Sequence, residues 1–221
     1  MVFHVHTSVL GNSDGSAELT VGNTKVITSI NGPIEPKGRQ ALPTMASLEI
    51  VIRPSVGVST TREKLLEDKL RSLLQAVIVR YKYPNQHIQI VVQFLITDST
   101  NGNEYTSKEL DAAIQCCYFA LIDANIYLNC SFASISLCLI DGKVITNPSY
   151  KQLLQSDSHH VVCFSIEDQK PQKVLLLESI GDFSESELFQ VISSCADDCV
   201  EVHQQQRKVI GDKIKKDYIW K

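Results

Sequence analysis

The sequence predicts a mixed α/β or α+β fold, in which mixed β-sheets are packed with helices in one domain that spans residues 1–221. Two observations support this prediction. Short runs rich in β-branched residues occur between longer segments whose apolar residues recur at helical spacing. No linker is long or polar enough to separate two domains. Because the strands come in runs with helices interspersed, a layered domain is expected.

Composition and charge limit the possible functions. The 221 residues are 43% hydrophobic and 21% charged, which is the ordinary range of globular proteins and allows a substantial core. The formal net charge of −4 argues against a protein that holds nucleic acid over its whole surface, so any such contact is expected to be local. No apolar run approaches the roughly 18 residues of a membrane span, and no secretory leader is evident, so we expect an intracellular protein without a membrane partner.

Seven cysteines, most of them in apolar segments, indicate buried thiols and not a disulfide framework. Cys195 and Cys199 share a helix face at i,i+4, as two metal ligands can, but no further Cys or His pair at zinc spacing accompanies them. His159-His160 also stands without a set of partner ligands. The sequence therefore predicts core packing for the cysteines, with no metal site and no cofactor.

Residues 11–33 predict a β-hairpin near the N-terminus. Asp14-Gly15 and Gly22-Asn23 are turn dipeptides, because glycine and asparagine reach positive φ at little steric cost. The segments 17–21 and 25–30 carry β-branched residues with partial alternation. The hairpin has an apolar face, which needs a covering layer.

Similar signals predict further strands. They cover the ranges 47–53, 88–96, 131–140, 144–146, 161–167 and 173–177. Asp141-Gly142 is the turn of one hairpin, and 168–172 is the turn of the last pair. The loop 33–43 contains three prolines and a glycine, which makes regular structure there improbable.

Helix starts are marked by capping boxes, in which Ser or Thr precedes Glu by three residues. They are Thr60 with Glu63, Thr106 with Glu109, and Ser184 with Glu187. The first two open helices with apolar stripes, and the third opens a long C-terminal helix over about 184–217. Asn147-Pro148 predicts the cap and the first-turn proline of a short helix.

The order of motifs in the N-terminal hairpin resembles the opening of the RNase PH family. It consists of Asp14-Gly15-Ser16, a strand, Gly22-Asn23-Thr24-Lys25-Val26, a second strand and Gly32-Pro33. Ile34–Lys37 and Leu48–Pro54 extend the match, and the resemblance covers nearly the whole chain. Within the family, the likeness is to the ring subunits of the eukaryotic exosome, and among these to the catalytically inactive subunit that most resembles bacterial RNase PH. The resemblance implies a single domain with mixed sheets.

Active members of this family degrade RNA from its 3′ end with phosphate as the nucleophile, and their phosphate pocket contains a Gly-Gly-Thr-Arg-Thr-Ala type of run at the start of a helix. The resemblance places this run at Asn101–Thr106, with Asn103, Glu104 and Thr106 in a degenerate phosphate site and Glu104 at the arginine position. A carboxylate about 4 Å from a phosphate repels it by about 4 kcal/mol per unit charge pair at an effective dielectric near 20. The backbone amides at the helix N-terminus stabilise a bound anion by only about 0.3–1 kcal/mol, which is less than this repulsion, so the site is expected to be inactive.

The family's acidic site resembles Asp-Leu-x-Tyr-x-Glu-Asp after a hairpin strand. In this chain Asn147 stands at the first aspartate position and Leu153 at the second, so this site is also expected to be degenerate. Asp157 lies nearby as one alternative acid. The resemblance therefore implies that the chain has no catalytic residues.

Basic residues ahead of and within the first helix line the RNA path in the family. Arg62 and Lys64 occupy that region, and Lys37 and Arg39 on the proline-rich loop are a second pair of RNA-contact candidates. Each of these residues can equally be an ordinary solvated charge.

The resemblance implies a non-catalytic exosome subunit for 3′–5′ RNA processing and degradation, including rRNA processing and mRNA turnover. Its partners would be other RNase PH-like subunits in a hexameric ring, RNA-binding cap subunits, and RNA in the central channel, in the nucleus, the nucleolus and the cytoplasm. One alternative is an active phosphate-dependent 3′–5′ exoribonuclease with a displaced or shared site, in which Glu104, Asp157 or the pair Glu109 and Asp111 would act. A second alternative is a homodimeric interaction module.

Overall fold

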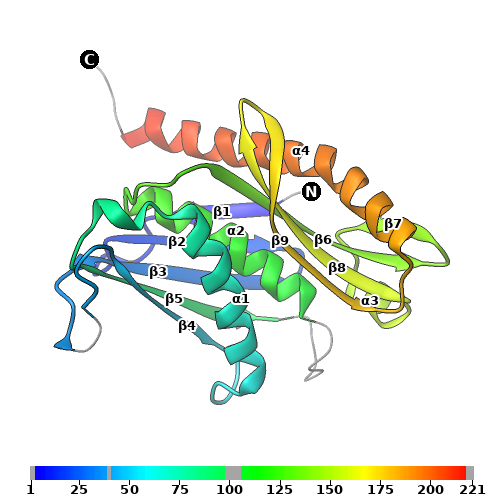
Figure 1. Ribbon diagram of the computed structural model, residues 1–221, viewed down its shortest axis with the longest axis horizontal. Helices are drawn as coiled ribbons and strands as arrows, with labels where there is room; N and C mark the ends of the chain where they lie inside the picture. Colours follow the sequence, from blue (N-terminus) through cyan, green and yellow to red (C-terminus); the bar gives the residue numbers. More distant parts are fainter. Residues whose placement is uncertain (1–2, 39–40, 98–105, 218–221) are drawn as a thin grey trace.

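The computed structural model describes residues 3–38, 41–97 and 106–217, and this part of the chain forms two β-sheets with helices between and over them (Figure 1). In chain order the elements are β1 (Phe3–Thr7), β2 (Gly15–Val21), β3 (Thr24–Ile34), β4 (Ser47–Arg53), α1 (Thr61–Val77), the 3₁₀ helix η2 (Arg80–Lys82), β5 (His87–Ile96), α2 (Ser107–Asp123), β6 (Ser131–Ile140), β7 (Lys143–Thr146), α3 (Tyr150–Leu154), β8 (Ser158–Glu167), β9 (Lys170–Gly181) and α4 (Glu185–Asp217). The predicted mixed α/β class is confirmed. No helix in these described ranges has the length and apolarity to cross a membrane.

The first sheet has the strand order β1-β2-β3-β5-β4. The predicted hairpin is present, with Leu19 opposite Val26 across β2 and β3. β4 and β5 pair in parallel, and α1 connects them, because parallel neighbours need a crossover. β1 was not predicted, because five residues that include His4 and His6 give a weak strand signal; it pairs antiparallel with β2 at the edge of the sheet.

The second sheet has the order β7-β6-β8-β9, and all its neighbours are antiparallel. The hairpin at Asp141-Gly142 is confirmed. The predicted turn over 168–172 is wrong in length, because only Asp168 and Gln169 separate β8 from β9. Both residues have positive φ, of 49° and 62°. Positive φ at both central residues suits a two-residue hairpin, whose twist then matches that of the strands.

α2 lies between the two sheets and belongs to the core of both. It packs against β2 and β3 on one side and against β6 and β8 on the other. Fourteen of its seventeen residues are buried, so the helix has almost no face toward solvent. Ala112, Ala113 and Ala120, the small residues expected to allow close packing, are all buried here. One hydrophobic cluster therefore extends through both sheets.

α4 covers the second sheet and contacts β6, β8 and β9 (Figure 1). Cys195 and Cys199 are fully buried on its inner face, as the packing prediction required. Burial raises the pKa of the Cys195 thiol to about 12, so this thiol stays protonated. Near the other end of α4, Lys213 forms an ion pair with Asp123, the last residue of α2. α4 is thereby joined to both halves of the molecule.

The capping predictions are confirmed for the first and the last long helix. Thr60 and Glu63 form the complete capping box of α1. Ser184 donates its backbone N–H to Glu187, and the N–H of Glu187 is in turn directed at the hydroxyl of Ser184. These bonds satisfy orphan backbone groups at each helix start.

Two other helix starts differ from the prediction. Thr106 precedes α2, but its side chain makes no capping bond, because its φ of −91° and ψ of −2° are helical and not the extended values of a capping residue. The Glu109 carboxylate is paired with Arg62. The cap of α3 is Ser149, which forms a capping box with Gln152, and not Asn147. Asn147 has a φ of 53° in the preceding turn, which a capping residue in extended conformation does not have.

Gly15 is required where β2 meets the end of α2. A Cβ at this position would lie 2.4 Å from the backbone nitrogen of Ala124 and 2.7 Å from the carbonyl oxygen of Ala120. We expect Gly15→Ala to lower the free energy of unfolding by about 1–3 kcal/mol, because α2 is held between two sheets and cannot move away. Urea denaturation measures the loss. Gly11→Ala is the matched control, since a Cβ at Gly11 meets nothing within 4 Å. Equal stability of the two variants would contradict the close approach.

Candidate functional site

A cavity of about 200 Å³ lies at the N-terminal end of α2, where the two sheets meet. Residues of the β2–β3 hairpin, α2, β6 and the segment after β7 form its wall: Val21, Gly22, Thr24, Lys108, Asp111, Ser136 and Asn147. Asn147, from the predicted acid site, therefore lies close to the first turns of the helix expected to follow the phosphate run. The sequence did not predict Thr24, Lys108 or Ser136 here, because only the pairing of distant elements brings them together.

Asp111 is the buried carboxyl group of this cavity. Its side chain accepts hydrogen bonds from the hydroxyl of Ser134 and from Nε2 of Gln115, the latter at 3.1 Å. Burial raises its pKa from 3.8 to about 6, although hydrogen bonds from Ser134, Gln115 and the backbone of Ser136 act in the opposite direction. A carboxyl group with this pKa can exchange a proton near neutral pH.

One hydroxyl in the cavity wall has no hydrogen-bond partner among the described residues. It belongs to Thr24, which is buried; the hydroxyl of Ser107, next to the wall residue Lys108 in the sequence, is also buried and unpaired there. Unpaired buried hydroxyls are costly unless water or a ligand satisfies them. The cavity therefore suits a small polar molecule or ordered water. Among the described residues no group of three or more His, Cys, Asp or Glu side chains is arranged to hold a metal ion.

The predicted acid positions lie in different surroundings. The backbone N–H of Asn147 donates to the carbonyl oxygen of Ser136 at 2.8 Å, which fixes it beside the cavity. Leu153 is buried on α3 and takes part in packing. Asp157, the alternative acid, is exposed and accepts a hydrogen bond from the backbone N–H of Asp141 at 3.1 Å. Its carboxylate stabilises the β6–β7 turn.

The predicted phosphate run is described only in part. Asn103 and Glu104 lie outside the described residues, and Thr106 is buried just before α2. The helix itself begins at Ser107, directly after the run.

Arg62 and Lys64, the first pair of RNA-contact candidates, differ in exposure. The guanidinium of Arg62 forms an ion pair with Glu109 at 2.7 Å, and only 15% of its side chain is exposed. The Lys64 side chain is 64% exposed and pairs with Glu67 at 2.7 Å. The other carboxylate oxygen of Glu67 accepts the backbone N–H of Ile52 at 3.0 Å. Lys64 thus presents its ammonium group to solvent, whereas Arg62 connects α1 to α2.

The second pair is not brought to the same place. Lys37 is exposed on the loop that follows β3, and Arg39 lies outside the described residues. Thr24, in the cavity wall, begins β3, and this strand runs for eleven residues before the loop starts. At about 3.3 Å per residue, the loop lies roughly 30 Å from the cavity. Lys37 therefore belongs to a different surface from the cavity.

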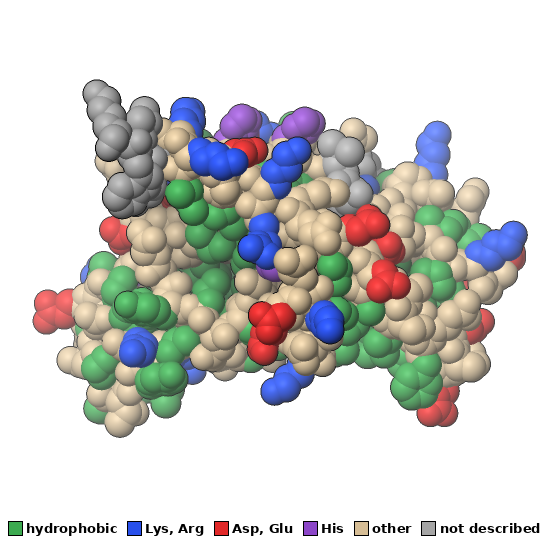
Figure 2. Space-filling model, turned by 90° about the horizontal axis from the view of Figure 1, so that it is seen from above, with side chains coloured by type: hydrophobic (Ala, Val, Ile, Leu, Met, Phe, Trp, Pro, Cys, Tyr) green, Lys and Arg blue, Asp and Glu red, His purple; other side chains and the backbone are tan. Residues whose placement is uncertain are grey.

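Charges are mixed over the surface in the view from above. Figure 2 shows Lys, Arg, Asp and Glu side chains interspersed on this face, without one large area of a single sign. This agrees with the net charge of −4 and with a local contact rather than a general nucleic-acid surface.

Comparison with known proteins shows the family of the chain. The model for the 3′ exoribonuclease family, domain 1, matches residues 2–127, and the model for domain 2 matches residues 130–194. The chain is 41% identical over 218 residues to the exosome complex component RRP46 of Saccharomyces cerevisiae, with 97% of each chain covered. It is 29% identical over 204 residues to the exosome complex component rrp46 of Schizosaccharomyces pombe, which covers 91% of this chain and 86% of the relative.

A solved structure has the same fold. The crystal structure of rice (Oryza sativa) Rrp46 matches with a TM-score of 0.79 at 24% sequence identity, covering 92% of this chain and 93% of the rice chain. Both sheets and the helix between them fall within the stretch matched by the two family models. The chain belongs to the RNase PH family of 3′ exoribonucleases, as its resemblance to that family predicted.

Proposed function

We propose that this chain is a non-catalytic ring subunit of the RNA exosome core, which supplies subunit interfaces and part of the RNA channel. The observation that carries the proposal is the 41% identity, over 97% of both chains, to a protein named as an exosome complex component. Its work is 3′–5′ RNA processing and degradation, including rRNA processing and mRNA turnover. Its partners are other RNase PH-like subunits in a hexameric ring, RNA-binding cap subunits and RNA, in the nucleus, the nucleolus and the cytoplasm.

The lack of catalysis is supported by the chemistry at the start of α2. Phosphorolysis needs a cationic pocket for phosphate and acidic groups for a metal or a proton. The resemblance places Glu104 where an arginine would bind phosphate, and Asn147 and Leu153 are neutral. We propose that Asn103, Glu104 and Thr106 are the remnant of the phosphate site.

RNA contact is proposed for Lys64, Arg62, Lys37 and Arg39. Lys64 has the strongest support, because its ammonium group is exposed beside the first turn of α1. Arg62 is engaged by Glu109, so its contribution is to position the start of α1 as much as to meet RNA. The core cluster that extends through both sheets supports folding of the whole chain as a single unit.

The purified complex tests this function directly. The chain is affinity-purified from its source, its native mass is measured, and labelled RNA with inorganic phosphate is assayed on the same sample and on the chain alone. We expect a hetero-oligomer of several chains of similar size, with no nucleoside diphosphate released by this chain alone. A homo-oligomer that releases diphosphates would overturn the proposal, and a homo-oligomer without activity would favour the interaction module.

An enzymatic alternative is favoured by one observation, the Asp111 carboxyl in the cavity with a pKa of about 6. Of the other acids suggested for this role, Glu109 is paired with Arg62 and Asp157 stabilises a turn. Asp111 would therefore have to act without a second carboxylate among the described residues of the cavity wall. Its hydrogen bonds to Ser134 and Gln115 give it a structural role that needs no catalysis.

Lys64→Gln tests the RNA path. We expect the complex to assemble normally, because Glu67 keeps its hydrogen bond from the backbone N–H of Ile52. It should protect RNA more weakly, because one phosphate contact is lost, and the salt dependence of RNA binding should fall by about one unit of slope. RNase protection across a salt series measures both effects. Arg71→Gln is the matched control, since Arg71 forms an i,i+3 ion pair with Asp68 on the same helix. Equal protection by wild type and Lys64→Gln would remove Lys64 from the RNA path.

Asp111→Asn separates a structural from a catalytic role. The folded protein holds the proton of Asp111 between pH 6 and 3.8, where the unfolded chain has lost it, so this group makes the wild type more stable as pH falls. The gain reaches about 3 kcal/mol for a shift of about two pKa units. His160, whose pKa burial lowers to about 4, acts in the opposite direction, so wild type and variant must be compared at each pH.

We expect the stability of Asp111→Asn relative to wild type to fall by up to about 3 kcal/mol between pH 7.5 and pH 4, as measured by urea denaturation. Asp68→Asn, at an exposed carboxyl of α1, controls for the loss of one charge. A parallel pH dependence of wild type and Asp111→Asn would contradict the buried acid. Loss of a phosphate-dependent activity in the variant would instead establish the enzymatic alternative.

A further inference from the structure

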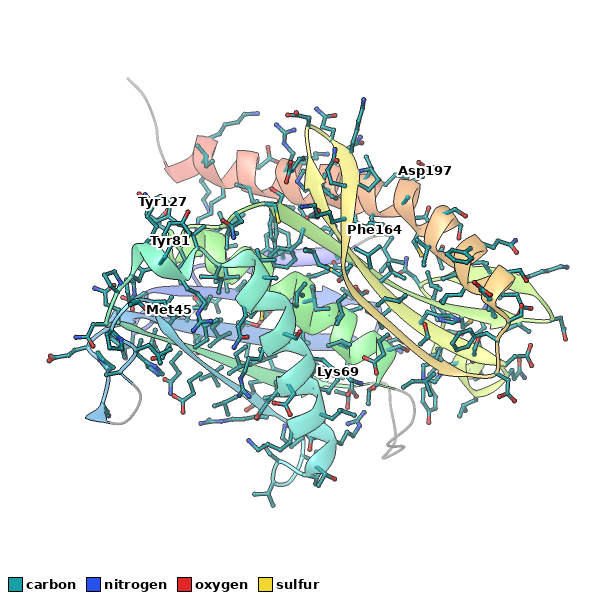
Figure 3. All side chains as sticks on the ribbon, in the orientation of Figure 1. Met45, Lys69, Tyr81, Tyr127, Phe164 and Asp197 are labelled. Atoms are coloured by element: carbon teal, nitrogen blue, oxygen red, sulfur yellow. The ribbon has the colours of Figure 1, made fainter. Side chains whose placement is uncertain are left out.

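A cluster of tyrosines lies at the C-terminal end of α1, away from the cavity. It consists of Tyr81, Lys82 and Tyr83, in and after the 3₁₀ helix η2, together with Tyr127 in the segment between α2 and β6; we call these four residues the tyrosine platform. Tyr81 is 68% exposed and Tyr127 is 61% exposed, which is far more than tyrosines that serve the core. Figure 3 shows both at the same end of the molecule, with Met45 nearby.

The tyrosine platform is held rigidly by hydrogen bonds between its two segments. The backbone N–H of Tyr127 donates to the hydroxyl of Tyr83 at 3.1 Å, and the carbonyl oxygen of Tyr127 accepts the N–H of Val79 at 3.0 Å. Ile78 and Leu128 add an antiparallel bridge. The rings of Tyr83 and Tyr127 have centroids 6.1 Å apart. These contacts fix the backbone of both segments and the ring of Tyr127, so this ring loses little conformational freedom on binding a ligand.

Positive charge accompanies the exposed rings. The ammonium group of Lys82 lies 5.8 Å from the centroid of the Tyr127 ring, and within the described part of the chain no carboxylate forms an ion pair with it. Neither of the two segments, 78–87 and 124–130, contains an aspartate or a glutamate. The chain as a whole has a net charge of −4, but these two segments combine aromatic rings with positive charge only.

The tyrosine platform is separate from the proposed RNA contact at Lys64. α1 has seventeen residues, so its two ends lie roughly 25 Å apart at 1.5 Å per residue. The platform instead adjoins the end of the loop that carries Lys37, because the N–H of Asn85 donates to the carbonyl of Leu42 and the N–H of Ala46 to that of Arg80. The side chain of Arg80 also donates to Ala46, at 2.9 Å, and so holds the loop end in place.

We propose that the tyrosine platform is a second binding surface for single-stranded RNA. Bases stack on exposed aromatic rings without regard to sequence, and a neighbouring ammonium group neutralises the backbone phosphate. Tyr81 and Tyr127 take one unpaired base each, and Lys82 contacts the phosphate between or beside them. The inference rests on RNA being the ligand of the proposed function, but it needs neither ring assembly nor a channel.

Fluorescence anisotropy of a labelled 12-nucleotide single-stranded RNA, titrated with the full-length chain at low salt, tests the platform without partners. We expect Tyr81→Ala with Tyr127→Ala to weaken binding about tenfold or more, as the loss of base stacking requires. Tyr81→Phe with Tyr127→Phe should bind almost as wild type, because the ring and not the hydroxyl carries the contact. Lys82→Ala should reduce the salt slope by about one.

Phe189→Ala is the matched control, because Phe189 is 62% exposed on α4. It should bind RNA as wild type does. Wild-type binding by the double alanine variant, or equal weakening by Phe189→Ala, overturns the proposal. Absence of measurable RNA binding by the wild-type chain at low salt overturns it as well. That result does not affect the proposed ring subunit, which is tested separately by native mass.

Hydroxyl-radical footprinting of the purified complex distinguishes RNA from a protein occupant. With RNA on the platform, Tyr81 and Tyr127 are reactive in the RNA-free complex and become protected when RNA is added. Protection of both tyrosines before RNA is added means that a protein subunit covers the surface, and this outcome overturns the proposal.

Discussion

The position of α2 between the two sheets is the constraint on which the rest of the structure depends. A helix with almost no exposed face must satisfy its polar groups inside the protein, and Asp111 does so through Ser134 and Gln115. The Cys116 thiol is likewise directed at the carbonyl oxygen of Ala17 in β2, at 3.3 Å. These contacts fix the helix from both sides. The cavity at its N-terminal end lies between residues of both sheets and the first turns of the helix.

Buried carboxylates organise the start of α1 next to this helix. Glu63, Glu67 and Glu109 are all at least 95% buried, and each contacts a cation or a backbone N–H. Removal of Arg62 would take the paired cation away from the buried Glu109 carboxylate, which is strongly destabilising. Basic residues in this region therefore serve two purposes. Arg62 has a structural role in an ion pair, whereas Lys64 is exposed and available to a ligand.

Much of the fold could be predicted from the sequence, because its signals are local. The hairpin at Asp14-Gly15 and Gly22-Asn23 and the capping boxes at Thr60 and Ser184 depend on residues only a few positions apart. The capping box predicted at Thr106 was wrong, because the backbone of Thr106 is helical and its side chain makes no capping bond, while Glu109 pairs with Arg62 of another helix.

The candidate site was less predictable for the same reason. Family resemblance directed attention to Asn147, but Thr24, Lys108 and Ser136 reach the cavity from three separate elements. No motif or spacing in the sequence predicts that these three residues lie together. The exposure of Tyr81 and Tyr127 is similarly a property of how η2 meets the segment after α2, although the alternation of basic and aromatic residues over 80–83 is visible in the sequence.

The long C-terminal helix α4 extends beyond the end of the region that the family model matches. The domain 2 model ends at residue 194, in the first third of α4, but Cys195, Cys199 and Val202 beyond that point are buried against the second sheet. Further on, Lys213 reaches back to Asp123 within domain 1. The part of the helix that the family model does not cover thus connects the two matched regions through its own contacts. Its buried side chains belong to the same hydrophobic core as those within the matched regions, so shortening the chain at residue 194 would expose the second sheet.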